Sequence, residues 1–319
     1  MQLDRRWLHL GFAALLLLVC HQRIVATADE QPTADALRYI TSALNLLDHG
    51  VLSMAEHRPD IEPAPGLLMG GPVTSLELAL AAALDGDLRQ TFECALTQRA
   101  DCVVHLSTLR WLHFLETILT LALIWLLGLR ILGRPLQAWL ACLLALACRD
   151  LFLYTGLALA EPLHLLLSVS TLYLLVRSAD PDGRFRHALL LGLCLGAGAL
   201  TRPAVLIWLP LAGALLLMVW IHRYRERSRP DWHALVRVVV AASLATAVVA
   251  SWVIRNWVVS QTATLSDPTY LDLALAHRAG YNAMDYHEWL VGWIYYLPDF
   301  GDSLAADLFP PESYRRLGW

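Results

Sequence analysis

WLHFLETILTLALIWLLGLRIL, residues 111–132, is the stretch that decides the fold class of this chain. It is almost wholly apolar, and a helix needs about 20 such residues to cross the hydrocarbon core of a bilayer. The whole chain is 57% hydrophobic and only 16% charged, whereas soluble domains carry about 25% charged residues. We therefore expect an all-α, multi-pass membrane protein with about seven spans. The other candidate spans are residues 7–26, 136–153, 162–176, 188–201, 204–221 and 234–254.

The arginines predict the orientation of these spans, because cytoplasmic loops are enriched in Lys and Arg. They cluster before the first span, between the second and third, between the fourth and fifth, and between the sixth and seventh. These are alternate loops, so they share one side, which we assign to the cytoplasm together with the N-terminus. The predicted location is a bacterial inner membrane.

The predicted organisation has four parts. Residues 1–26 are a first transmembrane anchor, 27–109 an outer, periplasmic loop, 110–254 the transmembrane bundle, and 255–319 an outer tail. The first segment also resembles a cleavable signal peptide, with Arg5-Arg6, an apolar run and small residues before Asp29. Apolar character resumes at Ile24, which favours the retained anchor.

Two features of the outer regions stand out. Cys94 and Cys102 lie in the large outer loop, where an oxidising compartment would allow a disulfide; two free thiols are the alternative. The tail contains EWLVGWIYYLPDFGD, residues 288–302. Its tryptophans and tyrosines are typical of the membrane–water interface, so we expect an interfacial segment there.

DALRYITSALNLLDHG, residues 35–50, predicts an amphipathic helix just beyond the first span. Leu37, Ile40 and Leu44 recur every three or four residues, which gives the helix one apolar face. Gly50 stands where a helix often ends in the left-handed conformation. We expect this helix to lie along the interface. Asp35 at its start is either an N-terminal cap or a catalytic acid.

Charged residues at the outer ends of spans are the other candidates for chemistry. Glu161 lies in a short outer turn, and ionisable groups at membrane depth often mark function; a helix-terminal acid is the alternative. Arg202 lies at an outer helix end, whereas the clusters of arginines described above lie on the predicted cytoplasmic side. A phosphate or a carboxylate such as Glu161 would compensate its charge. Arg110, His113 and Glu116 are spaced by three, so they share one helical face, either lining the same cavity or pairing with one another.

Several chemistries lack their sequence signals. There is no Walker-type phosphate loop, no dinucleotide-binding glycine motif and no HExxH zinc helix. Nothing indicates nucleic-acid binding. Asp60 and Glu62 form an isolated D-x-E that would suit a divalent cation, although a solvated turn explains them equally. No cofactor is otherwise indicated.

The order of motifs along the chain resembles the C-type membrane glycosyltransferases. The motifs are ADALRYITSALNLLDHGVLS (34–53), PAPGLLMGGPVTSLELALAAAL (63–84), AEPLHLLL (160–167), LTRPAVLIWLPLAGALLL (200–217) and IRNW (254–257). They are most similar to bacterial relatives of the protein mannosyltransferases, glycosyltransferase family 39, and to the aminoarabinose transferases that modify lipid A. The resemblance covers about residues 7–257.

This resemblance implies an inverting hexosyl or pentosyl transferase. Its donor would be a sugar on a polyprenyl phosphate, and its acceptor an envelope glycan, lipid or protein. Asp35 and Glu161 match the family's catalytic acids. Arg202 and Arg58 would bind the donor phosphate, and the remaining candidates for substrate binding are Tyr39, His113 and Glu116.

Two other functions stay open at this point. One is a transporter for a lipid-linked substrate, which would predict repeated halves and charges at mid-bilayer. The other is a non-catalytic or truncated membrane partner in envelope glycan synthesis, since the chain is shorter than usual members of the family.

Overall fold

The computed structural model describes residues 5–26, 34–97, 102–148, 150–180, 183–207, 232–269, 285–295 and 301–309, with single residues and short pieces between them. These residues are helical or irregular. Their single β-type pairing is an isolated bridge between Arg58 and Ile61. The all-α membrane fold predicted from the sequence is confirmed.

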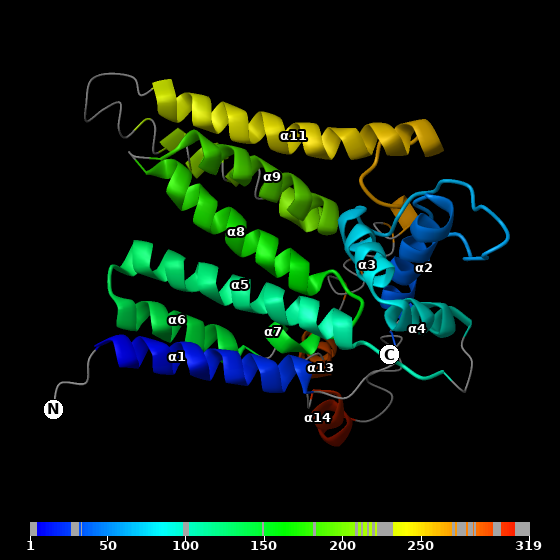
Figure 1. The fold of residues 1–319 in the computed structure, drawn as a ribbon, viewed down its shortest axis with the longest axis horizontal. Helices are drawn as coiled ribbons and strands as arrows, with labels where there is room; N and C mark the ends of the chain where they lie inside the picture. The colour runs from blue at the N-terminus through cyan, green and yellow to red at the C-terminus, as the bar shows by residue number, and fades with distance from the viewer. Residues whose placement is uncertain are drawn as a thin grey trace. The chain divides into compact units, whose positions relative to one another are not determined.

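Three of the described helices are long and apolar enough to cross a membrane. They are α5 (Ser107–Leu132), α8 (Glu161–Ala179) and α11 (Trp232–Ser260). Each contains one of the spans expected from hydropathy. In Figure 1 α5 lies beside α8, and the shorter helix α9 (Phe185–Thr201) lies between α8 and α11; we call these helices the bundle.

The remaining expected spans are shorter helices or, for the sixth, short helical pieces interrupted by undescribed residues. The first span is α1 (Arg5–Cys20) followed by a π-helical turn (His21–Val25). The third is divided into α6 (Pro135–Ala147) and α7 (Asp150–Leu153), and the fifth is α9 (Phe185–Thr201). The 3₁₀ turn η2 (Pro203–Ile207) begins the sixth, and the residues described after it are helical.

Small residues bring α9 and α11 into close contact. A Cβ added at Gly192 would lie 2.6 Å from the carbonyl oxygen of Ala241, and one at Gly196 would lie 2.7 Å from Cβ of Val248. Glycine therefore lets the two backbones approach, as is usual between membrane helices. Large apolar side chains are exposed on the other faces of these helices, among them Leu190, Val239 and Ile254.

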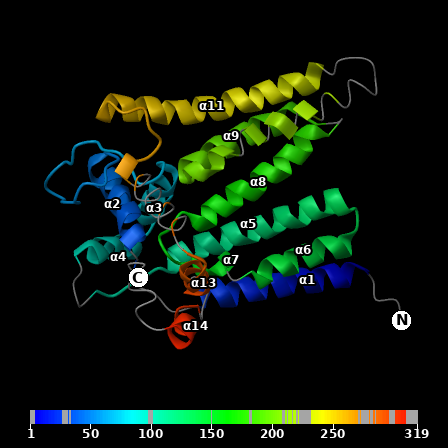
Figure 2. The same cartoon turned by 180° about the vertical axis from the view of Figure 1, so that it is seen from behind.

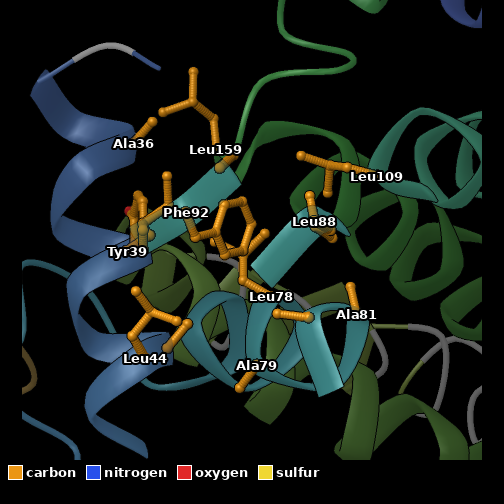
Figure 3. Packing of buried hydrophobic residues seen from close by; sticks show 14 of the residues in the cluster. Ala36, Tyr39, Leu44, Leu78, Ala79, Ala81, Leu88, Phe92, Leu109 and Leu159 are labelled. Carbon is orange, nitrogen blue, oxygen red and sulfur yellow. The ribbon is translucent and has the colours of Figure 1, made fainter. Parts of the chain in front are cut away.

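Beyond one end of the bundle lie α2 (Ala34–His49), α3 (Val73–Leu84), α4 (Gly86–Thr97) and the loop 50–72, which we call the α2–α4 assembly. Figure 2 shows the same arrangement from behind. Gly50 ends α2 with φ of 68°, as the sequence predicts. The apolar face of α2 is buried against protein: Ile40 and Leu44 pack with Leu78, Phe92 and neighbouring residues. Figure 3 shows this core.

At the opposite end of the bundle, Asp180 joins the last turns of α5 and α8. Asp180 accepts hydrogen bonds from Arg130 at 2.6 Å and from Arg177 at 3.0 Å. Arg130 lies in the last turn of α5 and Arg177 in the last turn of α8, directly before the two loops that the sequence assigns to the same side. The contact agrees with alternate loops sharing one side, while the assignment of that side to the cytoplasm stays a prediction.

Residues Asp267–Trp319 form a second compact unit. It contains α13 (Tyr286–Tyr295) and α14 (Gly301–Leu308). Trp289 stacks between Tyr286 and Trp293, with ring centroids 6.3 and 6.4 Å apart. The aromatic tail segment is thus partly helical, and its interfacial position remains a prediction.

Candidate active site

Glu161 and Arg202 form an ion pair at the end of the bundle that carries the α2–α4 assembly. Their closest atoms, Arg202 Nη2 and Glu161 Oε1, are 2.8 Å apart. Glu161 begins α8 directly before a proline, which suits the first turn of a helix. Arg202 follows the last residue of α9, directly before Pro203. Helix boundaries therefore place both charges at this end, and the carboxylate compensates the arginine as the sequence suggests.

Asp35 and Tyr39 lie on one face of α2 beside this pair. Asp35 is in the first turn with its side chain 63% exposed, and its Oδ1 lies 3.3 Å from Nη1 of Arg38. Tyr39 is buried. Burial raises the pKa of the Tyr39 hydroxyl to about 12; Arg202 opposes this shift, and the carboxylates of Glu161 and Asp35 add to it. Tyr39 thus lies within the electrostatic reach of all three candidate residues.

Two glycines let the loop before α3 approach the end of α9. A Cβ at Gly71 would lie 2.0 Å from the carbonyl oxygen of Leu200, so no other residue fits there without movement. A Cβ at Gly70 would lie 3.1 Å from the carbonyl oxygen of Thr201 and 3.6 Å from the Tyr39 hydroxyl. The motif GGP therefore packs against the residues just before Arg202 and completes one wall of the site.

The polar face of α5 supports the turn that precedes Glu161. The buried His113 accepts a hydrogen bond at Nδ1 from the backbone N–H of Gly156, at 3.0 Å. Gly156 has φ of 83°, and a Cβ there would lie 3.3 Å from Cγ of Arg110. His113 and Arg110 therefore position the loop that leads to Glu161, which is a different role from the predicted substrate contact of His113.

Glu116, the third residue of this face, hydrogen-bonds to Glu77 of α3. Two close carboxyl groups cannot both ionise readily, so we expect the pair to share a proton. Burial raises the pKa of Glu77, an effect that the hydrogen bond to Glu116 partly opposes. Sequence reasoning missed Glu77, although an acid within the apolar run LELALAAAL was the available signal.

Arg58 and the D-x-E motif lie in the loop 50–72, before the GGP motif. Arg58 pairs with Glu56 at 2.7 Å, and its carbonyl oxygen is 2.9 Å from Nε2 of His49. Asp60 and Glu62 are exposed. Within the described ranges, no group of three or more His, Cys, Asp or Glu side chains is arranged to hold a metal ion.

Arg255, in the IRNW motif that ends the seventh expected span, holds the loop of the α2–α4 assembly. Its Nη1 donates to the carbonyl oxygen of Gly66 at 2.5 Å, and its Nη2 to that of Leu52 at 2.7 Å. The guanidinium also lies 4.8 Å from the ring centroid of Trp252. Arg255 was not predicted as a functional residue from the sequence. The feature that could have indicated it is a cation at the outer end of an expected span, as for Arg202.

Cys94 and Cys102 are bonded as a disulfide, with their Cα atoms 5.8 Å apart. That separation is ordinary for a disulfide. The bond closes the loop between α4 and the segment leading to α5.

Comparison with known families matches residues 74–260 to "Dolichyl-phosphate-mannose-protein mannosyltransferase". The chain belongs to this mannosyltransferase family. The resemblance read from the motifs is confirmed. Family membership indicates a membrane glycosyltransferase that uses a sugar on a polyprenyl phosphate. The matched region includes Glu161, Arg202 and Arg255, whereas Asp35 and Tyr39 precede it. Comparisons with curated proteins and with solved structures gave no significant match.

Proposed function

We propose that this mannosyltransferase-family chain moves a sugar from a polyprenyl phosphate to an envelope acceptor at the outer face of the membrane. The observation that supports it most is the Glu161–Arg202 ion pair, which lies beside Tyr39. Tyr39 is on α2, the helix that also carries Asp35. Opposite charges at one helix-end site suit a reaction that needs both a base and a phosphate-binding cation.

In this proposal Asp35 is the general base. Its exposed carboxylate takes the proton of an acceptor hydroxyl, whose oxygen then attacks the anomeric carbon. A positioned base contributes about 10²–10⁴-fold to such reactions. The bond between the anomeric carbon and the phosphate oxygen breaks, and its electron pair leaves with the phosphate. Because the acceptor oxygen attacks from the opposite face, the configuration of the anomeric carbon is inverted.

Arg202 stabilises the leaving polyprenyl phosphate. Its guanidinium has five N–H donors in a planar fork, so the contact of Nη2 with Glu161 is compatible with further bonds to phosphate oxygens. Glu161 orients the guanidinium and compensates its charge before the donor binds. Tyr39, buried between these groups, fixes the surface of α2 against them.

The decisive variant is Asp35→Asn. Asparagine matches aspartate in size and stays polar in the first turn of α2, but it cannot accept the proton, so transfer should fall by about 10²-fold or more. The measurement is transfer from a radiolabelled polyprenyl-phosphate sugar in membranes, normalised to protein amount. Asp87→Asn is the matched control, because Asp87 is also an exposed aspartate in the first turn of a helix in the same assembly.

Arg202→Ala distinguishes donor binding from proton transfer in the same assay. It should raise the KM for the donor as well as lower kcat, whereas Asp35→Asn should act mainly on kcat. Near-normal transfer by Asp35→Asn would leave Asp35 with only a structural role in the first turn of α2 and would contradict the proposal.

A further inference from the structure

A group of arginines lies at the turn between α8 and α9, at the end of the bundle opposite the candidate active site. They belong to α5, α8, α9 and α11 or directly precede α9: Arg130, Arg177, Arg184, Arg186 and Arg237. We call this group the arginine patch. Figure 1 shows that α5 and α8 end, and α9 and α11 begin, at this end of the bundle. Arg177, Arg184 and Arg186 all act electrostatically on the buried His187, so their charges lie close together.

Hydrogen bonds hold three of these arginines around the turn. Asp180 accepts from Arg130 at 2.6 Å and from Arg177 at 3.0 Å. Arg237 is buried and donates to the backbone carbonyl oxygens of Gly183 and Asp180, at 2.6 and 3.4 Å. A carbonyl oxygen satisfies an N–H group but does not neutralise the guanidinium, so the charge of Arg237 adds to the patch.

The patch therefore carries an excess of positive charge. Arg184 and Arg186 are exposed, and neither forms an ion pair with a residue that the structure describes. The turn contains two acidic residues, Asp180 and Asp182, of which the second lies outside the described residues. Five arginines against two aspartates leave three positive charges uncompensated. An anionic ligand would compensate them.

The length of α8 places the patch at the depth of lipid head groups. Glu161 is the first residue of α8 and Arg177 lies in its last turn. At 1.5 Å per residue they are about 24 Å apart, and the hydrocarbon core of a bilayer is about 30 Å thick. If Glu161 lies at one membrane surface, Arg177 is close to the other. The patch is therefore separate from the proposed donor site and close to the head groups of the opposite leaflet.

Exposed apolar side chains continue from the patch towards the membrane core. Phe185 lies between Arg184 and Arg186 and is 51% exposed. The exposed apolar side chains further along α9 and α11 are Leu189, Leu190, Val236 and Val239. A soluble phosphate compound has no apolar part to place on these side chains, whereas a phospholipid has two acyl chains. Exposed cations beside exposed apolar side chains therefore favour a lipid.

We propose that the arginine patch binds the phosphodiester head group of an anionic glycerophospholipid, whose acyl chains pack along the exposed apolar side chains of α9. Arg184 and Arg186 donate hydrogen bonds to the phosphate oxygens, because a guanidinium presents its N–H groups in a fork that matches two oxygens. Basic pockets between membrane helices are known to bind anionic head groups. A zwitterionic lipid has the same phosphodiester but adds a cation, which the excess charge of the patch repels. This inference does not rest on the proposed glycosyl transfer.

The test is lipid binding to the full chain in detergent, measured by native mass spectrometry with no sugar donor present. The probes are dioleoylphosphatidylglycerol and dioleoylphosphatidylcholine, which share their acyl chains and their phosphodiester. Each arginine near the head groups contributes about fivefold in affinity for an anionic lipid. Wild type should therefore prefer phosphatidylglycerol by about 25-fold through Arg184 and Arg186. The double variant Arg184→Gln/Arg186→Gln should lose most of this preference.

Arg134→Gln is the matched control for Arg186→Gln. Arg134 is exposed shortly after α5, but it precedes α6, which lies on the other side of α5 from α8 (Figures 1 and 2). Arg186→Gln should weaken phosphatidylglycerol binding by about fivefold, and Arg134→Gln should leave it unchanged. Arg184→Lys/Arg186→Lys keeps both charges and should recover most of the affinity, which separates loss of charge from loss of folding.

The source of the phosphate is tested by competition. Glycerophosphoglycerol, the same head group without acyl chains, should not displace the lipid at equal concentration; displacement would show that the patch binds a soluble phosphate compound. Equal binding of the two lipids by wild type, an unchanged preference in the double glutamine variant, or equal losses in Arg134→Gln and Arg186→Gln would also overturn the proposal.

Discussion

The bundle and the α2–α4 assembly are held together by different interactions. In the bundle, α9 and α11 meet through Gly192 and Gly196, whose missing side chains let the backbones approach. In the α2–α4 assembly, the buried Asn45 and the guanidinium of Arg255 bind backbone carbonyls of the loop. Close packing suffices where the helices are long and apolar, whereas the irregular loop needs specific donors for its carbonyl groups. The candidate active site lies where these two kinds of structure meet.

Gly192→Ala should affect the largest part of the molecule, because it disturbs the packing of the bundle. The new Cβ would lie 2.6 Å from a backbone oxygen of α11, so the helices must separate. Overpacking of this kind costs about 1–3 kcal/mol, and the thermal unfolding midpoint in detergent should fall. Gly11→Ala in α1 is the control, because nothing lies within 4 Å of its added Cβ. Equal midpoints for the two variants would show that α9 and α11 do not depend on this contact.

Arg255→Ala should instead loosen the α2–α4 assembly and leave the bundle intact. Two hydrogen bonds from a charged group are lost, and the carbonyl oxygens of Leu52 and Gly66 lose their donors, at a cost of about 1.5–3 kcal/mol. Hydrogen exchange should accelerate in residues 50–72 and stay unchanged in α9. Arg255→Lys should restore only part of the protection, since a lysine lacks the fork that reaches both carbonyls. Unchanged hydrogen exchange in residues 50–72 would show that the hydrogen bonds of Arg255 do not hold this loop.

Glu77→Gln tests the link between the two regions and should have the smallest effect. Because burial raises the pKa of Glu77, the unfolded chain releases this proton at a lower pH than the folded chain does. Stability should therefore fall as pH rises above the ordinary carboxyl pKa. Glutamine can donate to Glu116 without a shared proton, so the variant should lose less stability between pH 5 and pH 8. The measurement is the thermal unfolding midpoint at pH 5 and at pH 8, with Glu62→Gln, at an exposed position, as the control. If the midpoint of Glu77→Gln changed with pH as much as that of the wild type, the shared proton would be contradicted.

The sequence predicts the elements that depend on local pattern. Hydropathy locates α5, α8 and α11, and helix periodicity together with Gly50 locates α2 and its end. The Glu161–Arg202 pair could be anticipated because an arginine at that helix end required a compensating charge. Each of these predictions depends either on the sequence pattern of one helix or on the need of one charged side chain for an opposite charge.

Contacts between distant segments could not be predicted in the same way. Nothing local to Glu77 indicates that its partner is Glu116, and nothing in IRNW indicates that Arg255 reaches Leu52 and Gly66. The expected membrane-surface burial of α2 gives way to a protein core for a similar reason. Its apolar face looks the same from the sequence whether α3 and α4 or lipid covers it.

The hydrogen bonds from Arg255 to the loop 50–72 also determine when this loop can fold during synthesis. The partners of Arg255 precede it by 189 and 203 residues, so the ribosome releases the loop long before the residue that fastens it. Chains fold progressively as they emerge, and contacts that close long loops form late. The loop 50–72 can therefore reach its final shape only after α11 has entered the membrane. A nascent chain that ends before that helix would therefore display the loop without these two hydrogen bonds.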